Sequence, residues 1–339
     1  MIQGPPGAGK TALLHQCAVE ADIDGWHVAK INNQALYEPA VMAQNLGEPY
    51  ITRKERVTTL DAKVVARATT TEMAGAAAVP QVLKALTPDT GLLLLLDEAQ
   101  TIGALTGRTY GPSVTTTLNA IHNGDLGRPV ILLCGGLGIS KSTFGALGIS
   151  RSDIGCMVNL GRLSEAAERA VIQDWLRKDG RAKGDVIPWT HAIASETHGW
   201  PQHIMCFAQP AAWVVRHNGG ELTPGRLAYV MERGHQGKTE YYQGRIDDVE
   251  KIIRSAIGKL LGSRPADREL DKHVILAALS GGRTPNEAQA EFDTLLHKGV
   301  IALTPEGSYA VPIPSMRDWL VERYGREDQL RWEDPGLDR

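Results

Sequence analysis

Eight residues near the start of the chain have the types and spacing that bind phosphate groups. They read Gly4-Pro5-Pro6-Gly7-Ala8-Gly9-Lys10-Thr11, which matches the pattern G-x-x-x-x-G-K-[ST] at every position. Gly7 and Gly9 allow the backbone to curl so that successive N–H groups point at phosphates. Lys10 supplies a mobile cation for the outer phosphates, and the Thr11 hydroxyl is suited to bind Mg²⁺. The pattern therefore predicts a loop that binds ATP together with Mg²⁺.

The residues after this loop predict a helix that faces the same phosphates. From Ala12 to Glu20, apolar residues recur at helical spacing. The N-terminus of a helix presents unpaired N–H groups and a positive dipole end to an anion. We therefore count Ala12 among the predicted nucleotide-binding residues.

A second stretch carries two carboxylates directly after an apolar run. Leu92 to Leu96 is a run of leucines, followed by Asp97 and Glu98. Such a run is typical of a strand buried on both faces of a parallel sheet. Its carboxyl end lies where open α/β folds bind ligands. We predict that Asp97 holds Mg²⁺ and that Glu98 orients and activates a water molecule, so that ATP is hydrolysed to ADP and phosphate.

The strand that should precede the phosphate loop is unusually short. Such a loop normally follows a buried strand of about five apolar residues, whereas Met1, Ile2 and Gln3 precede it here. Two interpretations remain open. Either the first strand is curtailed, or the sequence lacks upstream residues, including the segment that usually contacts adenine.

Length, composition and charge restrict the number of domains, the class of protein and the partners that the sequence can indicate. A chain of 339 residues predicts two or three domains, and its net charge of −3 does not indicate a global electrostatic attraction to nucleic acid. Four widely spaced cysteines without a C-x-x-C pair argue against a zinc site or a disulfide framework. No apolar run is long enough to span a bilayer, and no signal peptide precedes the phosphate loop. We therefore expect a cytoplasmic protein without a membrane partner.

The order of predicted elements indicates an α/β core followed by helices. Strands are predicted at 26–31, 92–96 and 129–134, and helices at 12–20, 34–46, 80–86 and 113–123. We assign residues 1–160 to a parallel-sheet nucleotide-binding core. Beyond Gly161, helices are predicted to begin at Ser164, near Pro188, at Pro201 and at Thr223, with a kink at Pro210. Residues 161–245 therefore form a predicted helical lid.

Residues 246–325 carry the pattern of a winged helix. Helical segments are predicted at 270–279 and 285–298, the second with Thr284 as its N-cap, and a hairpin is predicted around Glu306-Gly307. Helix, helix, hairpin is the order of a winged helix. Residues 326–339 form a charged tail.

With both motifs present, the chain resembles the AAA+ P-loop ATPases. The closest likeness is to the branch of origin-recognition initiators, transposition ATPases and STAND switches, and it covers nearly the whole chain. The resemblance implies a homo-oligomer in which Arg151, within Gly148-Ile149-Ser150-Arg151, reaches a neighbour's γ-phosphate. The alternative is a surface arginine at a loop end. Pro201, within His198-Gly199-Trp200-Pro201, resembles the G-x-P motif that abuts the nucleotide in STAND lids.

Two positions depart from the family pattern. The lid of AAA+ proteins usually carries an arginine where this chain has Gln202 and His203. His203 is a candidate substitute, but a lone histidine is more often structural than phosphate-sensing. The fourth strand usually ends in a polar sensor such as Asn, where this chain has Cys134-Gly135-Gly136, which leaves Ser140 as a weak candidate. The run Asp97-Glu98-Ala99-Gln100 also occurs in one group of helicases, but no other helicase signature is found.

The charges of the predicted winged helix leave two interpretations open. Its second helix carries Glu287, Glu291 and Asp293 against Lys298, and these carboxylates would repel a phosphate backbone. The helpful charges near it are Arg283 and Arg317. A more basic set lies earlier and is either a nucleic-acid contact or one solvated helix face: Arg245, Lys251, Arg254, Lys259, Arg264 and Arg268.

The function expected from these features is ATP hydrolysis by an oligomer that remodels or regulates a nucleic-acid-associated assembly, with DNA or a DNA-bound protein as partner. The alternative is a slow STAND-like switch that exchanges ATP and ADP to regulate a protein partner, with a winged helix that does not read DNA. A non-hydrolysing scaffold is disfavoured because Asp97 and Glu98 are both present.

Overall fold

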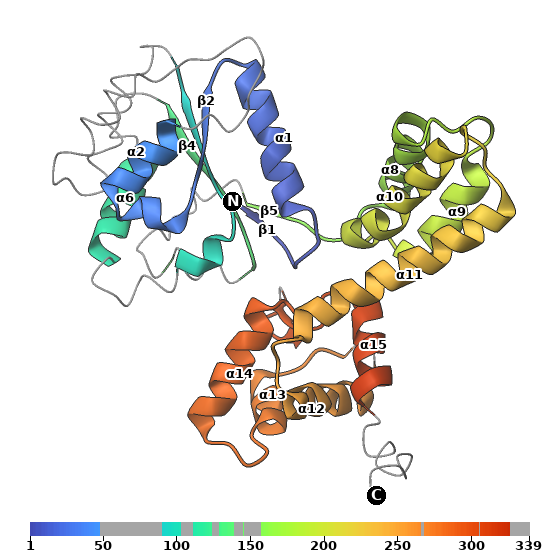
Figure 1. Ribbon diagram of the computed structural model, residues 1–339. Coiled ribbons are helices and arrows are strands. Elements are labelled where there is room, and N and C mark those ends of the chain that lie inside the picture. The colour runs from blue at the N-terminus through green and yellow to red at the C-terminus, as the bar shows by residue number, and fades with distance from the viewer. Residues whose placement is uncertain are drawn as a thin grey trace, which may run out of the picture. The chain divides into compact units, whose positions relative to one another are not determined.

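The computed structural model of the protein places two groups of residues in separate compact units (Figure 1). The first unit comprises Met1–Gly4 and Gly9–Leu160, and the second comprises Pro5–Ala8 and Gly161–Arg339. Within these units the structure describes residues 1–47, 90–102, 111–123, 129–138, 145, 157–265, 268–304 and 306–325. The helix predicted at 80–86, Ser140, Arg151 and the tail 326–339 lie outside the described residues.

The first unit is built on a parallel sheet. Its strands are β1 (Ile2–Gln3), β2 (His27–Ile31), β3 (Leu92–Leu96), β4 (Val130–Gly136) and β5 (Val158–Asn159). Their order across the sheet is β2-β3-β4-β1-β5, and every pair is parallel. The predicted α/β fold with a parallel sheet is therefore confirmed.

Helices cover both faces of this sheet (Figure 1). The described ones are α1 (Lys10–Ile23), α2 (Pro39–Gly47) and α6 (Gly111–Asn123), with 3₁₀ turns η1 (Asn33–Leu36) and η2 (Ala99–Ile102). One apolar layer joins Leu14 and Ala18 of α1 to Leu93 and Leu95. A second layer, on the opposite face, contains residues of α2 and α6 together with the remaining leucines of β3.

Strand β3 shows why a run of leucines is required. All its residues are buried, with successive side chains in alternate layers. A strand with apolar layers on both faces cannot alternate between apolar and polar residues. Each buried leucine contributes about 1.5–3 kcal/mol, so the strand that ends in Asp97 and Glu98 is firmly fixed in the core.

Strand β1 is two residues long yet lies between two neighbours. Ile2 pairs with Gly135 of β4 and Val158 of β5, and Gln3 pairs with Gly136 and Asn159. The Gln3 side chain also donates to Oδ1 of Asn159 at 3.2 Å. The curtailed strand is therefore stabilised by pairing on both edges.

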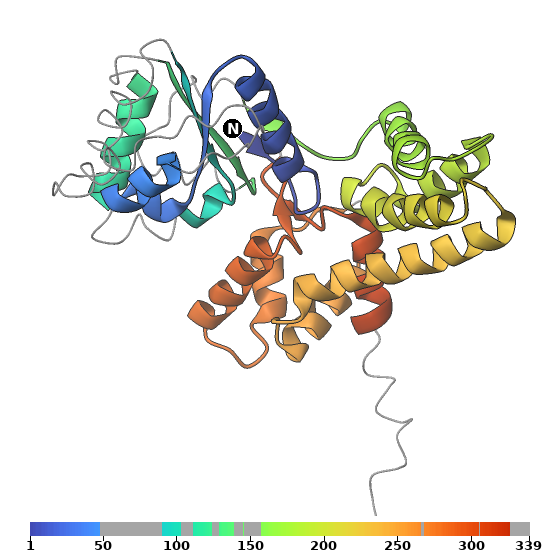
Figure 2. The same ribbon diagram turned by 45° about the horizontal axis from the view of Figure 1, so that its top comes forward.

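The second unit begins with helices, as predicted. They are α8 (Glu165–Asp174), the π-helical turn η3 (Trp175–Asp179), α9 (Ile187–Thr197), α10 (Pro201–His217) and α11 (Pro224–Ile246). Ser164 caps α8 by accepting from the Ala167 N–H at 3.3 Å. Helix α10 runs through Pro210 without interruption. Figure 2 shows α11 as one long helix.

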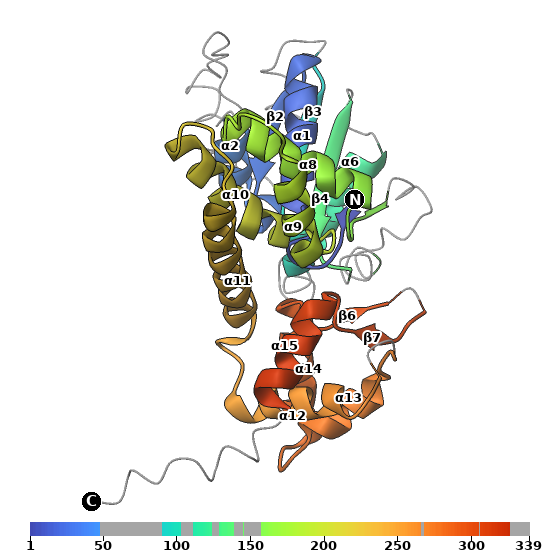
Figure 3. The ribbon, with the colours of Figure 1, turned by 90° about the vertical axis from the view of Figure 1, so that its right-hand side faces the viewer.

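The C-terminal part of this unit contains helices and one hairpin (Figure 3). Its elements are α12 (Lys251–Gly262), α13 (Lys272–Leu279), α14 (Pro285–His297), β6 (Ala302–Leu303), β7 (Tyr309–Ala310) and α15 (Pro314–Tyr324). Thr284 and Glu287 form a full capping box at the start of α14. Helix α13 starts two residues later than predicted because Leu270 pairs with Tyr309 beside the hairpin.

The described residues include no helix that is both long and apolar enough to cross a membrane.

Candidate active site

The phosphate-binding pattern folds into a curled loop between β1 and α1. Gly7 and Gly9 have φ angles of 76° and 93°, a region that residues with side chains rarely adopt. Ala8 N–H donates to the Pro5 carbonyl at 3.2 Å, which closes a turn inside the loop. Gly9 then caps α1 and accepts from the Leu13 N–H at 3.0 Å. The loop therefore delivers its last residues to a helix N-terminus, where anions bind.

Lys10 and Thr11 are the first residues of α1 and make different contacts. Lys10 is 7% exposed, and its Nζ donates to the Gly4 carbonyl at 2.9 Å. The exposed Thr11 hydroxyl donates to Oδ2 of Asp97 at 2.7 Å. The fold thus joins the loop to the carboxylate that follows β3, as the predicted metal site requires.

Asp97 and Glu98 lie at the carboxyl end of β3. Oδ1 of Asp97 accepts from the Glu98 N–H at 3.0 Å, so both oxygens of this carboxylate are engaged. Glu98 is exposed and has a φ angle of 55°, in the left-handed region. The Thr11 hydroxyl and the Asp97 carboxylate are hard oxygen ligands, which fit Mg²⁺ because this ion completes its octahedron with waters and phosphates.

Gly135 of β4 leaves room for the Asp97 carboxylate. A Cβ at this position would lie 3.1 Å from Oδ1 of Asp97 and 2.7 Å from Cδ1 of Leu14. The neighbouring Cys134 is buried, and its burial raises the pKa of the thiol to about 12. The departure from the family pattern at Cys134-Gly135-Gly136 therefore has a packing reason, and Cys134 is a neutral core residue.

Sequence reasoning missed the contacts of Gln100, in the 3₁₀ turn η2. Its side chain is buried, its Nε2 donates to Oε2 of Glu98, and its Oε1 accepts from the Leu137 N–H at 3.1 Å. Thr101 also holds the Glu98 carbonyl, through its hydroxyl at 2.7 Å and its N–H at 3.0 Å. The signal in the sequence was the position of Gln100, two residues after the predicted catalytic residue Glu98.

The tip of the phosphate loop, Pro5–Ala8, belongs to the second unit and contacts its helices. The Gln202 N–H, in the first turn of α10, donates to the Gly7 carbonyl at 3.1 Å. The Tyr241 hydroxyl of α11 donates to the Pro6 carbonyl at 2.9 Å. Gly7 has no space for a side chain, because a Cβ there would lie 2.6 Å from the Tyr241 oxygen.

The turn that precedes α10 is held by a buried carboxylate. His198 and Gly199 have φ angles of 48° and 75°, and Pro201 is the first residue of α10. Glu168 of α8 is 5% exposed and accepts from the Gly199 N–H at 2.6 Å and from the Thr197 hydroxyl. Glu168 was not predicted, because it lies far from this turn in the sequence.

His203 has the environment of a structural residue. It is 1% exposed, its Nε2 lies 2.9 Å from the Tyr242 hydroxyl, and that hydroxyl also contacts Ser315 at 2.8 Å. Burial lowers the pKa of His203 to about 4, with a further contribution from Lys238. His203 is therefore neutral at pH 7 and lacks the charge that phosphate sensing by an arginine supplies.

Several basic groups around α14 bind partners within the protein. Arg283 pairs with Glu250, and Lys298 pairs with Asp248. Arg317 donates to the carbonyls of Leu261 and Arg264, each at 2.7 Å, with its side chain 13% exposed. The two charges predicted to favour DNA near α14, Arg283 and Arg317, are thus engaged inside the second unit.

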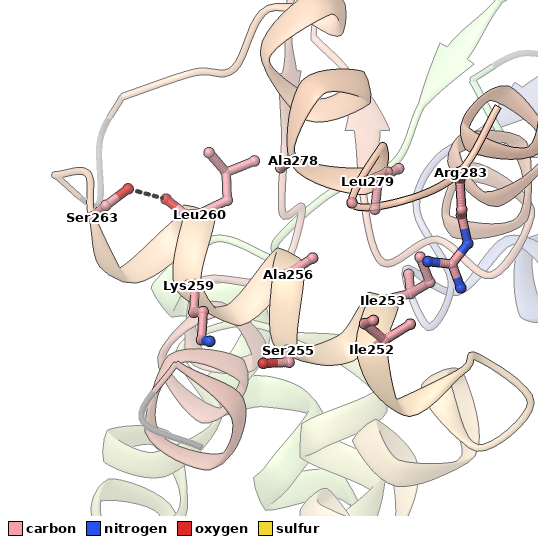
Figure 4. A pocket seen from close by; sticks show the side chains of 11 residues that line it. Ile252, Ile253, Ser255, Ala256, Lys259, Leu260, Ser263, Ala278, Leu279 and Arg283 are labelled. Carbon is pink, nitrogen blue, oxygen red and sulfur yellow. Dashed lines mark hydrogen bonds between the residues drawn. The ribbon is translucent and has the colours of Figure 1, made fainter. Parts of the chain in front are cut away.

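A groove of about 510 Å³ lies between α12 and α13 (Figure 4). Its lining is mainly apolar, with Ile252 and Leu260 on α12 and Leu279 on α13. The Arg283 guanidinium at its edge is paired with Glu250. The residues that line the groove include the hydroxyls of Ser255 and Ser263 but no carboxylate such as that of Asp97.

Comparison with known proteins identifies solved structures that share this fold. No family model and no curated protein matches the sequence. The structure matches the ORC2 protein of Aeropyrum pernix in its ADPNP-ADP complexes, with a TM-score of 0.57, 13% identity and coverage of 97% of this chain and 88% of that one. This chain therefore has the fold of that ORC2 protein. A Walker-type ATPase of Pyrococcus abyssi matches with a TM-score of 0.59 and 12% identity, over 94% of this chain and 89% of that one.

The likeness extends over nearly the whole chain, as the sequence resemblance predicted. The ADP form of the Aeropyrum pernix ORC2 protein matches with a TM-score of 0.53 and 14% identity, and covers 98% of this chain and 87% of that one. The AAA+ fold predicted from the two motifs is therefore confirmed.

Proposed function

We propose that this protein binds ATP with Mg²⁺ and hydrolyses it to ADP and phosphate. The observation that carries the proposal is the 2.7 Å hydrogen bond from the Thr11 hydroxyl to Oδ2 of Asp97. It brings together the two oxygen ligands that the motifs predicted for one metal ion. The AAA+ fold supports the same activity, since the Aeropyrum pernix ORC2 protein is described with ADPNP and ADP.

Each residue of the proposed site is assigned one role in phosphate binding, metal binding or hydrolysis. The loop from Gly4 to Ala12 surrounds the phosphates, with the N–H groups of Gly7 and of Gly9 to Ala12 as donors, and Lys10 neutralises the outer phosphates. Thr11 and Asp97 hold Mg²⁺, which when bound offsets the charge that develops on the phosphates. Glu98 takes a proton from the water whose oxygen bonds to the γ-phosphorus, while the bond from that phosphorus to the leaving oxygen of ADP breaks.

The active form is proposed to be a homo-oligomer in which Arg151 stabilises a neighbouring subunit's transition state. A permanently charged planar guanidinium suits that task. Pro201 is proposed to abut the nucleotide, because it starts the helix after a turn that Glu168 holds in shape. We divide the chain into a core at 1–160, a lid at 161–245, a winged helix at 246–325 and a tail at 326–339.

We further propose that the ATPase remodels or regulates a nucleic-acid-associated assembly. The support is its fold, shared with an origin-recognition protein. A second candidate is a slow nucleotide switch that regulates a protein partner. It is favoured by the internal pairing of Arg283 and Arg317, which leaves α14 with exposed carboxylates at Glu287 and Asp293.

One experiment separates the candidates: ATP turnover of the wild type and of Glu98→Gln, each with and without duplex DNA. DNA-stimulated turnover that Glu98→Gln abolishes supports the first candidate. Slow turnover with retained ADP that DNA does not change contradicts it and supports the switch. Equal turnover of both proteins contradicts hydrolysis by this site.

A further inference from the structure

We propose that Gln100 is the positioning residue for Glu98 and holds its carboxylate ready for the attacking water. This inference rests on the proposed hydrolysis. It concerns a side chain for which neither motif assigns a task. The relevant groups all lie at one edge of the sheet, in the first unit.

The geometry gives Gln100 two contacts with different parts of the core. Its Nε2 donates to Oε2 of Glu98, and its Oε1 accepts from the Leu137 N–H at 3.1 Å, directly after β4. Gln100 is 6% exposed, its contact with Leu137 is buried, and its contact with Glu98 is partly buried. Gln100 therefore ties the exposed carboxylate of Glu98 to the rigid end of β4.

The partners determine the orientation of the Gln100 amide. An ionised carboxylate only accepts hydrogen bonds, and a backbone N–H only donates them. The amide nitrogen must therefore face Glu98 and the amide oxygen must face Leu137. Glutamine has the donor, the acceptor and the length that this bridge requires. A carboxylate at position 100 would face Glu98 with a second acceptor.

These contacts continue a chain of hydrogen bonds that begins at the phosphate loop. The Thr11 hydroxyl donates to Asp97, Asp97 accepts from the Glu98 N–H, and Glu98 accepts from Gln100. The metal-binding hydroxyl and the base are thus fixed in one network. An exposed glutamate otherwise samples several rotamers, so this tether raises the fraction of time that its carboxylate is correctly placed.

The test compares Gln100→Met, which removes both contacts, with Gln100→Glu, which keeps an acceptor for Leu137. Gln16→Met is the matched control, since Gln16 makes a 2.7 Å bond of the same kind with Glu20 on the exposed face of α1. The measurements are kcat and the dissociation constant of a fluorescent ATP analogue. A melting curve verifies that each variant is folded.

We expect Gln100→Met to lower kcat by about 10- to 100-fold, with the dissociation constant changed by less than about twofold. In Gln100→Glu, a second carboxylate faces Glu98 in place of the amide donor, so we expect kcat to fall as well. In a Glu98→Gln background, Gln100→Met should cause no further loss, because Gln100 acts through Glu98. Gln16→Met should match the wild type.

The outcomes distinguish this inference from the function on which it rests. If Glu98→Gln leaves only a small residual turnover while both Gln100 variants retain or exceed wild-type kcat, the positioning role is wrong and hydrolysis stands. If Gln100→Met weakens nucleotide binding in proportion to its loss of kcat, or still lowers kcat in the Glu98→Gln background, the positioning role is wrong. Gln100 then stabilises the structure of the site and does not act through Glu98. If Glu98→Gln leaves turnover unchanged, both the proposed function and this inference fail.

Discussion

The backbone N–H of Gly199 donates a 2.6 Å hydrogen bond to Oε1 of Glu168, thirty-one residues earlier in the chain. This bond, together with that from the Thr197 hydroxyl, fixes the turn from which α10 starts. Gly199 itself has a φ angle of 75° and no room for a Cβ, which would lie 2.5 Å from the Leu163 carbonyl oxygen. The carboxylate and the glycine therefore define one local structure.

The first prediction concerns the stability of this turn. Glu168→Ala leaves the Gly199 N–H without its partner in a buried position, and we expect the free energy of unfolding to fall by about 1–3 kcal/mol. Urea unfolding followed by tryptophan fluorescence measures the loss. Glu165→Ala is the control, because Glu165 is exposed and pairs with Arg169 on the surface, so its effect should stay below about 1 kcal/mol. Equal losses of unfolding free energy in the two variants would show that the buried contact of Glu168 stabilises the protein no more than the surface pair of Glu165.

The second prediction concerns ATP affinity. Lys10→Ala removes the cation that the loop supplies, and we expect the dissociation constant of a fluorescent ATP analogue to rise by at least about tenfold. Lys30→Ala, at an exposed position on β2, should leave it unchanged. Unaltered affinity in Lys10→Ala would contradict phosphate binding by this loop.

The third prediction concerns the space beside Asp97. In Gly135→Ala the new methyl group meets Oδ1 of Asp97 and Cδ1 of Leu14, so the carboxylate must shift by a few tenths of an ångström. We expect the Mg²⁺ concentration for half-maximal turnover to rise by about tenfold. Gly138→Ala is the control, because a Cβ there meets no atom of the described residues within 4 Å. An unchanged Mg²⁺ dependence would show that Asp97 does not bind the ion through this arrangement.

The fourth prediction concerns acid stability. The pKa of His203 is lowered to about 4 by burial, from an ordinary value of 6.5. The unfolded chain therefore binds this proton first, so the stability from neutral His203 is complete above about pH 6.5 and is lost as the pH falls toward 4. From pH 7 to pH 5 this amounts to about 2 kcal/mol.

Urea midpoints at pH 7 and pH 5 measure this fourth effect. His203→Gln should flatten the dependence, whereas His273→Gln, at an exposed position on α13, should not. A steep acid dependence retained in His203→Gln would assign the effect to other groups.

Local patterns predicted the elements that carry the chemistry. The residues of the phosphate loop, Gly4 to Thr11, are contiguous in the sequence, so the motif is recognised directly. The run of leucines in β3 predicts by itself a strand that is buried on both faces. The helices α12 and α15 were not predicted as separate elements, although the apolar residues of α12 recur at helical spacing. Gln100, Glu168 and Tyr241 could not be assigned roles, because each role depends on a partner brought close by the tertiary fold.

The insertion of β1 between β4 and β5 has a consequence for how the chain folds. The strand that leads into the phosphate loop is synthesised before its partners Gly135 and Val158, which come more than a hundred residues later. Pairings of such high sequence separation form slowly, because a long loop must close before they contribute. During synthesis, Ile2 and Gln3 therefore cannot form their strand pairings until β4 and β5 have been synthesised. We expect ribosome-bound chains to acquire nucleotide affinity abruptly, once the segment through Asn159 has left the exit tunnel.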